Sequence, residues 1–173
     1  MQIRDALLPD LPEIQAIYAH HVLHGTGTFE EEPPSIEEMT DRYHKVVDHG
    51  WAWLVASDAT GVLGFAYYEQ FRDRSAYRHT AENSIYIRDD VRGQGVGKAL
   101  GTRLIETATT AGFRTMIAVI GDSENVGSIG VHASLGFQHV GTLRAAGLKF
   151  GRWLDVVQMQ RTLGLGDSEI PTA

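Results

Sequence analysis

The chain has 173 residues, a net charge of −7 and 43% hydrophobic residues, which predicts one domain with a sizeable core. The acidic balance argues against nucleic-acid binding driven by overall charge, so we expect no nucleic-acid partner. The absence of cysteine excludes disulfides, thiolate metal sites and a cysteine nucleophile. The N-terminal residues contain no apolar run and no stretch reaches membrane-spanning length, so we expect a cytoplasmic protein without a membrane partner.

The first third of the chain is predicted to form one short strand and two helices. Residues 1–6 are typical of a strand, and residues 9–24 carry apolar side chains at helical spacing. These side chains are Leu11, Ile14, Tyr18 and Val22. A loop over residues 25–34 leads to a second helix, which begins at Ser35 with Glu38 completing a capping box.

The middle of the chain is predicted to contribute three strands to a sheet. Residues 51–56 and 62–68 are apolar runs of strand length, and residues 58–61 turn between them. A polar loop rich in arginine covers residues 71–80. Residues 81–87 then form the third strand.

A basic glycine-rich segment follows this strand and opens a helix over residues 98–111. It reads Arg92-Gly93-Gln94-Gly95-Val96-Gly97 and is followed by Lys98. Glycines let the backbone approach a ligand closely and a helix N-terminus supplies unpaired N–H donors, so the segment suits a pyrophosphate. The pattern R-x-x-G-x-G fits neither the dinucleotide loop nor the nucleoside-triphosphate loop, and a plain surface turn capping the helix is the alternative.

The last third of the chain is predicted to complete the sheet. Residues 116–120 are typical of a buried strand, and residues 125–135 of a short helix that ends at Gly136. Residues 137–143 and 153–160 are predicted to be the closing strands.

The order of these elements predicts an α/β fold with a mixed central sheet and helices on both faces. We place a single domain at residues 1–162 and a loose C-terminal tail at residues 163–173. The sequence contains no internal repeat or low-complexity tract that would indicate another architecture.

Several segments resemble the GNAT acetyltransferases and together cover roughly residues 3–161. The glycine-rich segment matches the coenzyme A pyrophosphate loop of that family, R/Q-x-x-G-x-G/A. The second GNAT signature reads N-x-x-S-x-x-x-[HY]-x-x-L-G-F. This chain has a similar pattern in Asn125, Ser128, His132 and Leu135-Gly136-Phe137. Residues 141–155 closely resemble the phosphinothricin N-acetyltransferase subgroup, and residues 82–87 resemble both that subgroup and the methionine sulfoximine/sulfone acetyltransferases.

This resemblance implies the GNAT fold, with acetyl-CoA as co-substrate. In GNAT enzymes the central strand parts from its neighbour and its backbone binds pantetheine, a role that the resemblance assigns here to Ile85 and Ile87. The full set of residues assigned to acetyl-CoA is Ile85, Tyr86, Ile87, Arg92, Gly93, Gln94, Gly95, Val96, Gly97, Lys98, Asn125, Ser128 and Ser134. Asn125 is also a good helix N-cap, and both roles can hold together.

Two residues are the candidate catalytic groups. The resemblance assigns the general base to Glu82, acting directly or through water, and burial would raise its pKa toward that task. The alternative is a strand-end glutamate paired with an arginine. His132 can assist deprotonation of the amine or protonate the leaving thiolate near neutral pH, or it can simply be a packed helix histidine.

The acceptor site is expected in two loops. By resemblance, an early substrate loop contains Phe29 and Glu30. The second loop, just before the central strand, contains Arg72, Arg74, Ser75, Ala76 and Tyr77. An arginine there can hold an α-carboxylate, although solvated surface charges are an equal alternative. This loop departs from both subgroups, so the acceptor is not carried over from them.

We therefore expect an acetyl-CoA-dependent N-acetyltransferase acting by direct transfer on the α-amine of a small amino acid or analogue. Methionine sulfone, methionine sulfoximine and phosphinothricin are the leading acceptors, and the resemblance implies a homodimer. No metal is expected, because His20 and His24 share a helix face without a clear third ligand. The alternatives are a transferase for a protein N-terminus, a polyamine or an aminoglycoside, or a non-catalytic acyl-CoA sensor, with a nucleotide-binding protein as a more distant alternative.

Overall fold

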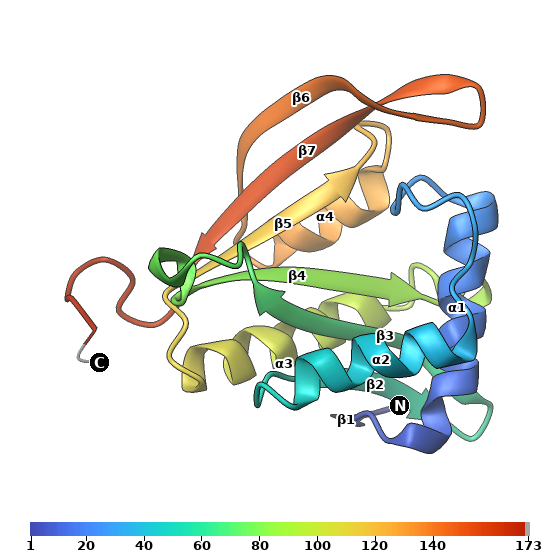
Figure 1. Ribbon diagram of the computed structural model, residues 1–173, viewed down its shortest axis with the longest axis horizontal. Helices are drawn as coiled ribbons and strands as arrows, with labels where there is room; N and C mark the ends of the chain where they lie inside the picture. Colours follow the sequence, from blue (N-terminus) through green and yellow to red (C-terminus); the bar gives the residue numbers. More distant parts are fainter. Residues whose placement is uncertain (172–173) are drawn as a thin grey trace.

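Helices cover both faces of a seven-stranded sheet in the computed structural model, which describes residues 1–171 (Figure 1). The strands are β1 (Gln2–Asp5), β2 (Trp53–Asp58), β3 (Gly61–Gln70), β4 (Thr80–Ile87), β5 (Thr115–Gly121), β6 (Gln138–Lys149) and β7 (Arg152–Thr162). The helices are α1 (Leu11–His24), α2 (Ile36–Val47), α3 (Val96–Thr110) and α4 (Val126–Ser134), with short 3-10 turns η1 (Leu8–Asp10), η2 (Ser75–Tyr77) and η3 (Asp89–Val91). The predicted α/β fold with a mixed sheet is confirmed. The last two residues of the predicted tail, 172–173, lie outside the described residues.

The sheet contains one parallel pair, which is unusually short. Its strand order is β1-β2-β3-β4-β5-β7-β6, and β4 with β5 is the parallel pair while the other neighbours are antiparallel. The β4–β5 ladder runs from Thr80–Thr115 only to Asn83–Ala118. Beyond that point β4 stays paired with β3 and β5 stays paired with β7, so the two strands part. The parting leaves backbone groups of the sheet interior without a strand partner.

Two apolar cores lie on opposite faces of the sheet. On one face α1 and α2 pack against the sheet through Ile14, Met39 and Phe65, which are at most 2% exposed. On the other face α3 and α4 pack around Leu100 and Met116, both fully buried. Because successive side chains of a strand point to opposite faces, neighbouring residues of β4 belong to different cores.

Local sequence signals account for the start of α2 and the position of α4. At the start of α2 the Glu38 N–H donates to Ser35 Oγ at 3.1 Å, and the Ser35 N–H donates to Glu38 Oε2 at 2.7 Å, so the predicted capping box is confirmed. Asn125 Oδ1 caps α4 by accepting from the Ser128 N–H at 3.2 Å. These contacts satisfy N–H groups that a helix start would otherwise leave unpaired.

The hairpin of β6 and β7 extends further than the sequence pattern indicated. The predicted strand over residues 137–143 was too short, because β6 continues through a register shift to Lys149. Its last residues pair with the start of β7, including Leu148 with Trp153. Phe150 and Gly151 close the hairpin with positive φ angles of 53° and 71°. The core also includes Leu163, which is 1% exposed.

A buried lysine at the end of β6 holds the loop between α1 and α2. Lys149 is 2% exposed, and its Nζ donates to the carbonyl oxygens of Gly25 at 2.9 Å and Thr28 at 2.8 Å. The Phe29 ring of the same loop lies directly on Gly147, where a Cβ would collide with it. The loop over residues 25–34 is therefore fixed to the β6–β7 hairpin although more than a hundred residues separate them in sequence.

Replacing Lys149 with Met should destabilise the fold by about 2 kcal/mol, because two carbonyl oxygens would lose the donor that satisfies them. Chemical denaturation of the wild type and Lys149→Met measures this difference. Lys45→Met is the matched control, since Lys45 is 65% exposed in its ion pair with Glu69, and its cost should stay below about 0.5 kcal/mol. Equal effects of the two substitutions would contradict the role of Lys149.

Candidate active site

A cavity of about 740 Å³ lies where β4 and β5 part. The open half of β4, the end of β5, the glycine-rich loop, the start of α4 and the end of α1 form its wall. The predicted acetyl-CoA residues on this wall are Ile85, Tyr86, Ile87, Arg92, Gly93, Gly95, Val96, Gly97, Lys98, Asn125 and Ser128. Gln94 and Ser134 do not line it; Ser134 lines a second cavity of about 730 Å³, together with Lys98.

The glycine-rich loop has the backbone that its composition predicts. Gly93 and Gly95 have φ angles of 74° and 82°, a region that side chains with a Cβ rarely adopt. Gly95 is the N-cap of α3, and Val96, Gly97 and Lys98 of the first turn line the cavity, so this wall includes a helix start with unpaired N–H groups. Arg92 stands beside them, with its Nε 3.1 Å from Asp89 Oδ1. The loop can therefore bind an anion through backbone donors and a nearby cation.

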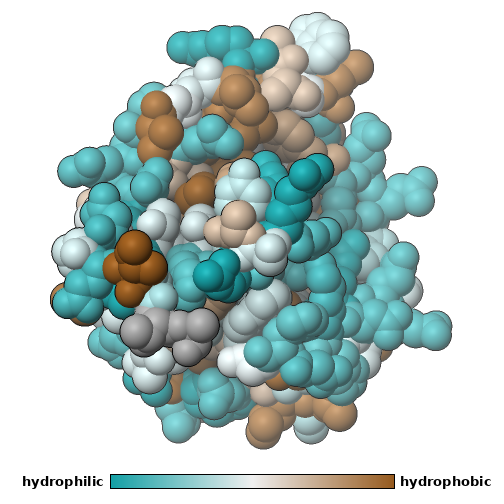
Figure 2. Space-filling view, turned by 60° about the vertical axis from the view of Figure 1, so that its left-hand side comes forward, coloured by the Kyte–Doolittle hydropathy of each residue, from teal (hydrophilic) through white to brown (hydrophobic). Residues whose placement is uncertain are grey.

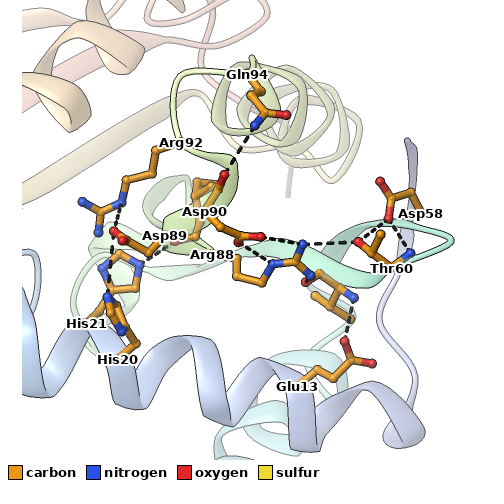
Figure 3. Close-up of polar contacts among 12 residues, drawn as sticks. Glu13, His20, His21, Asp58, Thr60, Arg88, Asp89, Asp90, Arg92 and Gln94 are labelled. Atoms are coloured by element: carbon orange, nitrogen blue, oxygen red, sulfur yellow. Dashed lines mark hydrogen bonds and ion pairs between the residues drawn. The ribbon is translucent and has the colours of Figure 1, made fainter.

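Polar contacts anchor the η3 turn that leads into this loop (Figure 3). Arg88 Nε donates to Asp90 Oδ1 at 2.7 Å, and Arg88 Nη1 donates to the Val62 carbonyl of β3 at 3.1 Å. Gln94 Nε2 donates to the Asp90 carbonyl at 3.4 Å. The side chain of Gln94 thus holds the loop to the turn, which explains why it does not line the cavity.

In the open half of β4, the backbone N–H and C=O groups of alternate residues face the gap left by β5. The Arg88 N–H donates to the Leu63 carbonyl of β3 at 2.9 Å, so the backbone of Arg88 faces β3. Since backbone groups of successive residues point to opposite sides of a strand, Tyr86 also faces β3, while Ile85 and Ile87 face the gap left by β5. These are the two residues that the resemblance assigns to pantetheine.

His21 of α1 is a site residue that the sequence did not indicate. Its Nε2 donates to the Ile87 carbonyl at 2.9 Å, so one of the two backbone groups of Ile87 is already bound by α1. Burial lowers the pKa of His21, and the charge of Arg92 lowers it further, while the Ile87 carbonyl opposes the shift. A neutral imidazole in this position acts as a fixed support for the end of β4.

His132 lies on the cavity wall and is held at both ring nitrogens. The side chain is 5% exposed; Nδ1 is 2.8 Å from the Ser128 carbonyl and Nε2 is 3.1 Å from Asn83 Nδ2. The Phe137 ring packs edge-on against it, with 5.1 Å between centroids. Burial lowers the pKa of His132, and the Ser128 carbonyl opposes that shift. The sequence analysis did not predict the contact with Asn83.

Glu82 lies on the opposite face of the sheet from His132. Successive side chains of a strand point to opposite faces, and His132 contacts Asn83, the residue after Glu82. The side chain of Glu82 therefore points to the other face. Burial raises the pKa of the Glu82 carboxyl, Arg72 lowers it and the carboxylate of Glu69 raises it. Arg72 Nη1 is 3.7 Å from Glu82 Oε2, so the arginine pairing expected as the alternative is also present. The structure does not bring the two candidate catalytic groups together.

The predicted acceptor residues fall into two separate groups. Phe29 lies beside Gly121 at the C-terminal end of β5, whereas the loop of Arg72, Arg74 and Tyr77 precedes the N-terminal end of β4. Because β4 and β5 are parallel, these groups lie at opposite ends of the strand pair, as Figure 1 shows. Within one chain they do not form one pocket.

The side chains of the two groups differ in whether other residues of the chain already bind them. Glu30 accepts from Arg42 Nη1 at 2.8 Å and from the Tyr18 hydroxyl at 2.9 Å, so its carboxylate is already bound within the chain. Arg72 stacks over the Phe71 ring at 4.1 Å, and Tyr77 is 38% exposed. Arg74, Ser75 and Ala76 are also exposed.

Within residues 1–171, no three histidine, aspartate or glutamate side chains cluster in a way that could hold a metal ion. The rings of His20 and His24 are 4.8 Å apart at their centroids. No helix in the same range has the length and apolar character needed to cross a bilayer.

Comparison with known proteins identifies the family. A family model described as an acetyltransferase (GNAT) domain matches residues 3–158. The chain is 51% identical to the phosphinothricin N-acetyltransferase of Alcaligenes faecalis, over 94% of this chain and 82% of that protein. It is 44% identical to the L-methionine sulfoximine/L-methionine sulfone acetyltransferase of Pseudomonas aeruginosa, over 93% of this chain and 94% of that protein.

A solved structure shares the whole fold. The crystal structure of a GNAT superfamily phosphinothricin acetyltransferase from Sinorhizobium meliloti in complex with AcCoA has a TM-score of 0.96 and 46% sequence identity. The match covers 99% of this chain and 92% of that chain. With the family model matching most of its length, the chain belongs to the GNAT family of acetyltransferases.

Proposed function

We propose that this protein transfers the acetyl group of acetyl-CoA to the α-amine of a small amino acid or analogue. Methionine sulfone, methionine sulfoximine and phosphinothricin are the leading acceptors, in line with the names of the relatives. The observation that carries the proposal is the parting of β4 and β5 beside the glycine-rich loop. A strand edge with free backbone groups next to an anion site suits a long ligand that has amides at one end and a pyrophosphate at the other.

In this proposal acetyl-CoA lies along the cavity. The pyrophosphate binds the N–H groups of the glycine-rich loop, with Arg92 and Lys98 supplying charge. The pantetheine amides bond to the free backbone groups of Ile85 and Ile87, between β4 and α4. Asn125 Oδ1 already caps α4, and its Nδ2 donates to the Gly121 carbonyl at 3.4 Å, so the second N–H of Nδ2 is the donor left for the ligand.

The chemistry is proposed as direct transfer in a ternary complex. The acceptor amine approaches from the face of α1 and α2, where Glu82 removes its proton directly or through water. The amine nitrogen then bonds to the thioester carbonyl carbon, and the carbon–sulfur bond breaks to release the thiolate of CoA. A backbone N–H of β4 can stabilise the oxyanion between these two steps, and positioning contributes most of the rate gain.

The acceptor itself is proposed to bind near the loop before β4. Arg72 and Arg74 are exposed there, and a guanidinium can bind the α-carboxylate through two hydrogen bonds. Arg72 also lies beside Glu82, so one side chain can orient the acceptor next to its base. We place the reaction in the cytoplasm, where acetyl-CoA is available.

We further propose a homodimer formed through the β6–β7 hairpin. Its exposed apolar side chains are Val140, Leu143, Leu148, Phe150 and Trp153, each more than half exposed. In Figure 2, apolar residues gather in the upper part of the visible face, where β6 and β7 run in Figure 1. Exposed apolar patches of this kind often mark protein interfaces. A second chain docked there would also lie near Phe29, because Lys149 and Gly147 fix that loop to the hairpin.

A thiol-release assay with acetyl-CoA and a panel of amines tests the proposed reaction. The panel contains methionine sulfone, methionine sulfoximine, phosphinothricin, ordinary amino acids, spermidine, an aminoglycoside and an N-terminal peptide. We expect saturable turnover on an amino-acid analogue, and Glu82→Gln should lower kcat/KM by about 10²–10⁴-fold because it removes the base. Turnover on the peptide or polyamine alone would contradict the proposed acceptor.

The pH dependence of the same assay tests the role of Glu82. A base must be deprotonated, so kcat/KM should fall as the pH decreases through the pKa of Glu82, which burial places above the usual range of a glutamate. Arg72 lowers this pKa, so Arg72→Gln should move the acidic limb to higher pH. Glu69 raises it, so Glu69→Gln should move the limb to lower pH. A limb that stays in place in both variants would rule out Glu82 as the titrating base.

Sedimentation equilibrium tests the proposed dimer. Leu148 and Trp153 are cross-strand partners, so Trp153→Glu places a charge in the centre of the apolar patch and should convert a dimer into a monomer at micromolar concentration. Leu7→Glu is the matched control, because Leu7 is 57% exposed but lies outside the hairpin. A monomeric wild type, or a Trp153→Glu variant that remains dimeric, would refute this interface.

A further inference from the structure

Asn83 occupies the point where β4 and β5 part. It forms the last pair of the β4–β5 ladder, opposite Ala118, and is one of the residues that line the cavity. The residue is 6% exposed, and its Nδ2 is 3.1 Å from Nε2 of His132. Its Oδ1 is buried without a hydrogen-bond partner. A buried amide that is bonded at one end only needs an explanation, because an unsatisfied polar atom costs about 1–3 kcal/mol.

The contacts of His132 determine which of its nitrogens carries the proton. Nδ1 is 2.8 Å from the Ser128 carbonyl, which can only accept, so Nδ1 must be the donor. In the neutral ring Nε2 is then an unprotonated acceptor, and it must receive a hydrogen bond from the Asn83 amide group. The resting ring can therefore take up a proton only at Nε2, on the side of Asn83.

We propose that Asn83 is a positioning residue that sets the protonation state of His132 by reversing its amide group. In the neutral state the amide donates its N–H to Nε2. When the ring takes up a proton from solvent or substrate, a new N–H bond forms at Nε2, and rotation of the amide by 180° presents Oδ1 to accept it. The unpartnered Oδ1 is thus the acceptor that the imidazolium requires. This inference goes beyond the proposed function, whose steps do not involve His132.

Few groups other than Asn83 are placed to affect the protonation state of His132. The lowered pKa of His132 arises from burial, opposed by the Ser128 carbonyl. Other charged or titratable residues also line this cavity. They are His21 and His24 of α1, Arg92 and Lys98 of the glycine-rich loop and the start of α3, Asp122 and Glu124 of the loop before α4, and Arg152 of β7. Within residues 1–171 none of them forms a hydrogen bond or an ion pair with the imidazole, and Arg152 is already paired with Asp122 at 2.7 Å.

NMR titration of ¹⁵N-histidine-labelled protein tests the proposal without any acceptor. The wild type should show His132 as the Nδ1–H tautomer, with a pKa below the usual histidine range. Asn83→Leu discriminates best, because it removes both hydrogen bonds. If the amide reverses, the imidazolium loses its acceptor, and the pKa of His132 should fall further by about one pH unit. If the amide were fixed, Leu would remove only the bond to the neutral ring, and the pKa would rise.

Asn83→Asp is the companion variant, since a carboxylate beside Nε2 should raise the pKa of His132 by about one pH unit or more. If Asn83→Leu fails to fold, the proposal is tested by the His132 pKa in Asn83→Asp and by the tautomer of His132 in the wild type. A wild-type Nε2–H tautomer, a rise in Asn83→Leu, or an unchanged His132 pKa in Asn83→Asp would each overturn the proposal. The titration needs neither acetyl-CoA nor turnover. A failure of the proposed function would appear in the amine panel instead, so the two failures can be told apart.

Discussion

The early end of the β4–β5 ladder is the constraint on which the rest of the site depends. Four residue pairs join the strands, and then each strand follows its other neighbour, β4 with β3 and β5 with β7. Backbone groups that a continuous sheet would have paired are left facing a cavity. An unpaired backbone group inside a protein is costly, so such an opening persists where a ligand or another side chain satisfies it. His21 already does this for the Ile87 carbonyl, and the remaining groups suit the amides of pantetheine.

The same opening separates the candidate chemistry into two sides. Alternation along β4 sends Glu82 toward α1 and α2 and Asn83 toward α4, where it meets His132. One side therefore presents a half-buried carboxylate with a raised pKa, and the other a neutral imidazole held at both nitrogens. In the proposed reaction the acceptor enters from the first side and acetyl-CoA from the second, so the strand edge is where the two reactants meet.

The sequence predicted the features that depend on nearby residues. The capping box of Ser35 and Glu38 and the glycine-rich loop are local patterns, and the structure contains both. The extension of β6 to Lys149 was missed because its partners lie on β7, across a register shift. The contacts of His21 with Ile87 and of Asn83 with His132 join residues that are far apart in sequence, and no local pattern marks them. The assignment of roles to site residues remains a prediction drawn from the family resemblance.

Amide hydrogen exchange with and without acetyl-CoA tests the central claim most directly. The account predicts that acetyl-CoA slows exchange at Ile85 and Ile87, whose N–H groups face the gap left by β5. Tyr86, between them, faces β3 and should be protected already in the free protein, which makes it an internal control. Slower exchange at Ile85 and Ile87 alone would place the co-substrate along the open half of β4. Saturating acetyl-CoA with no change at these two amides would contradict the account.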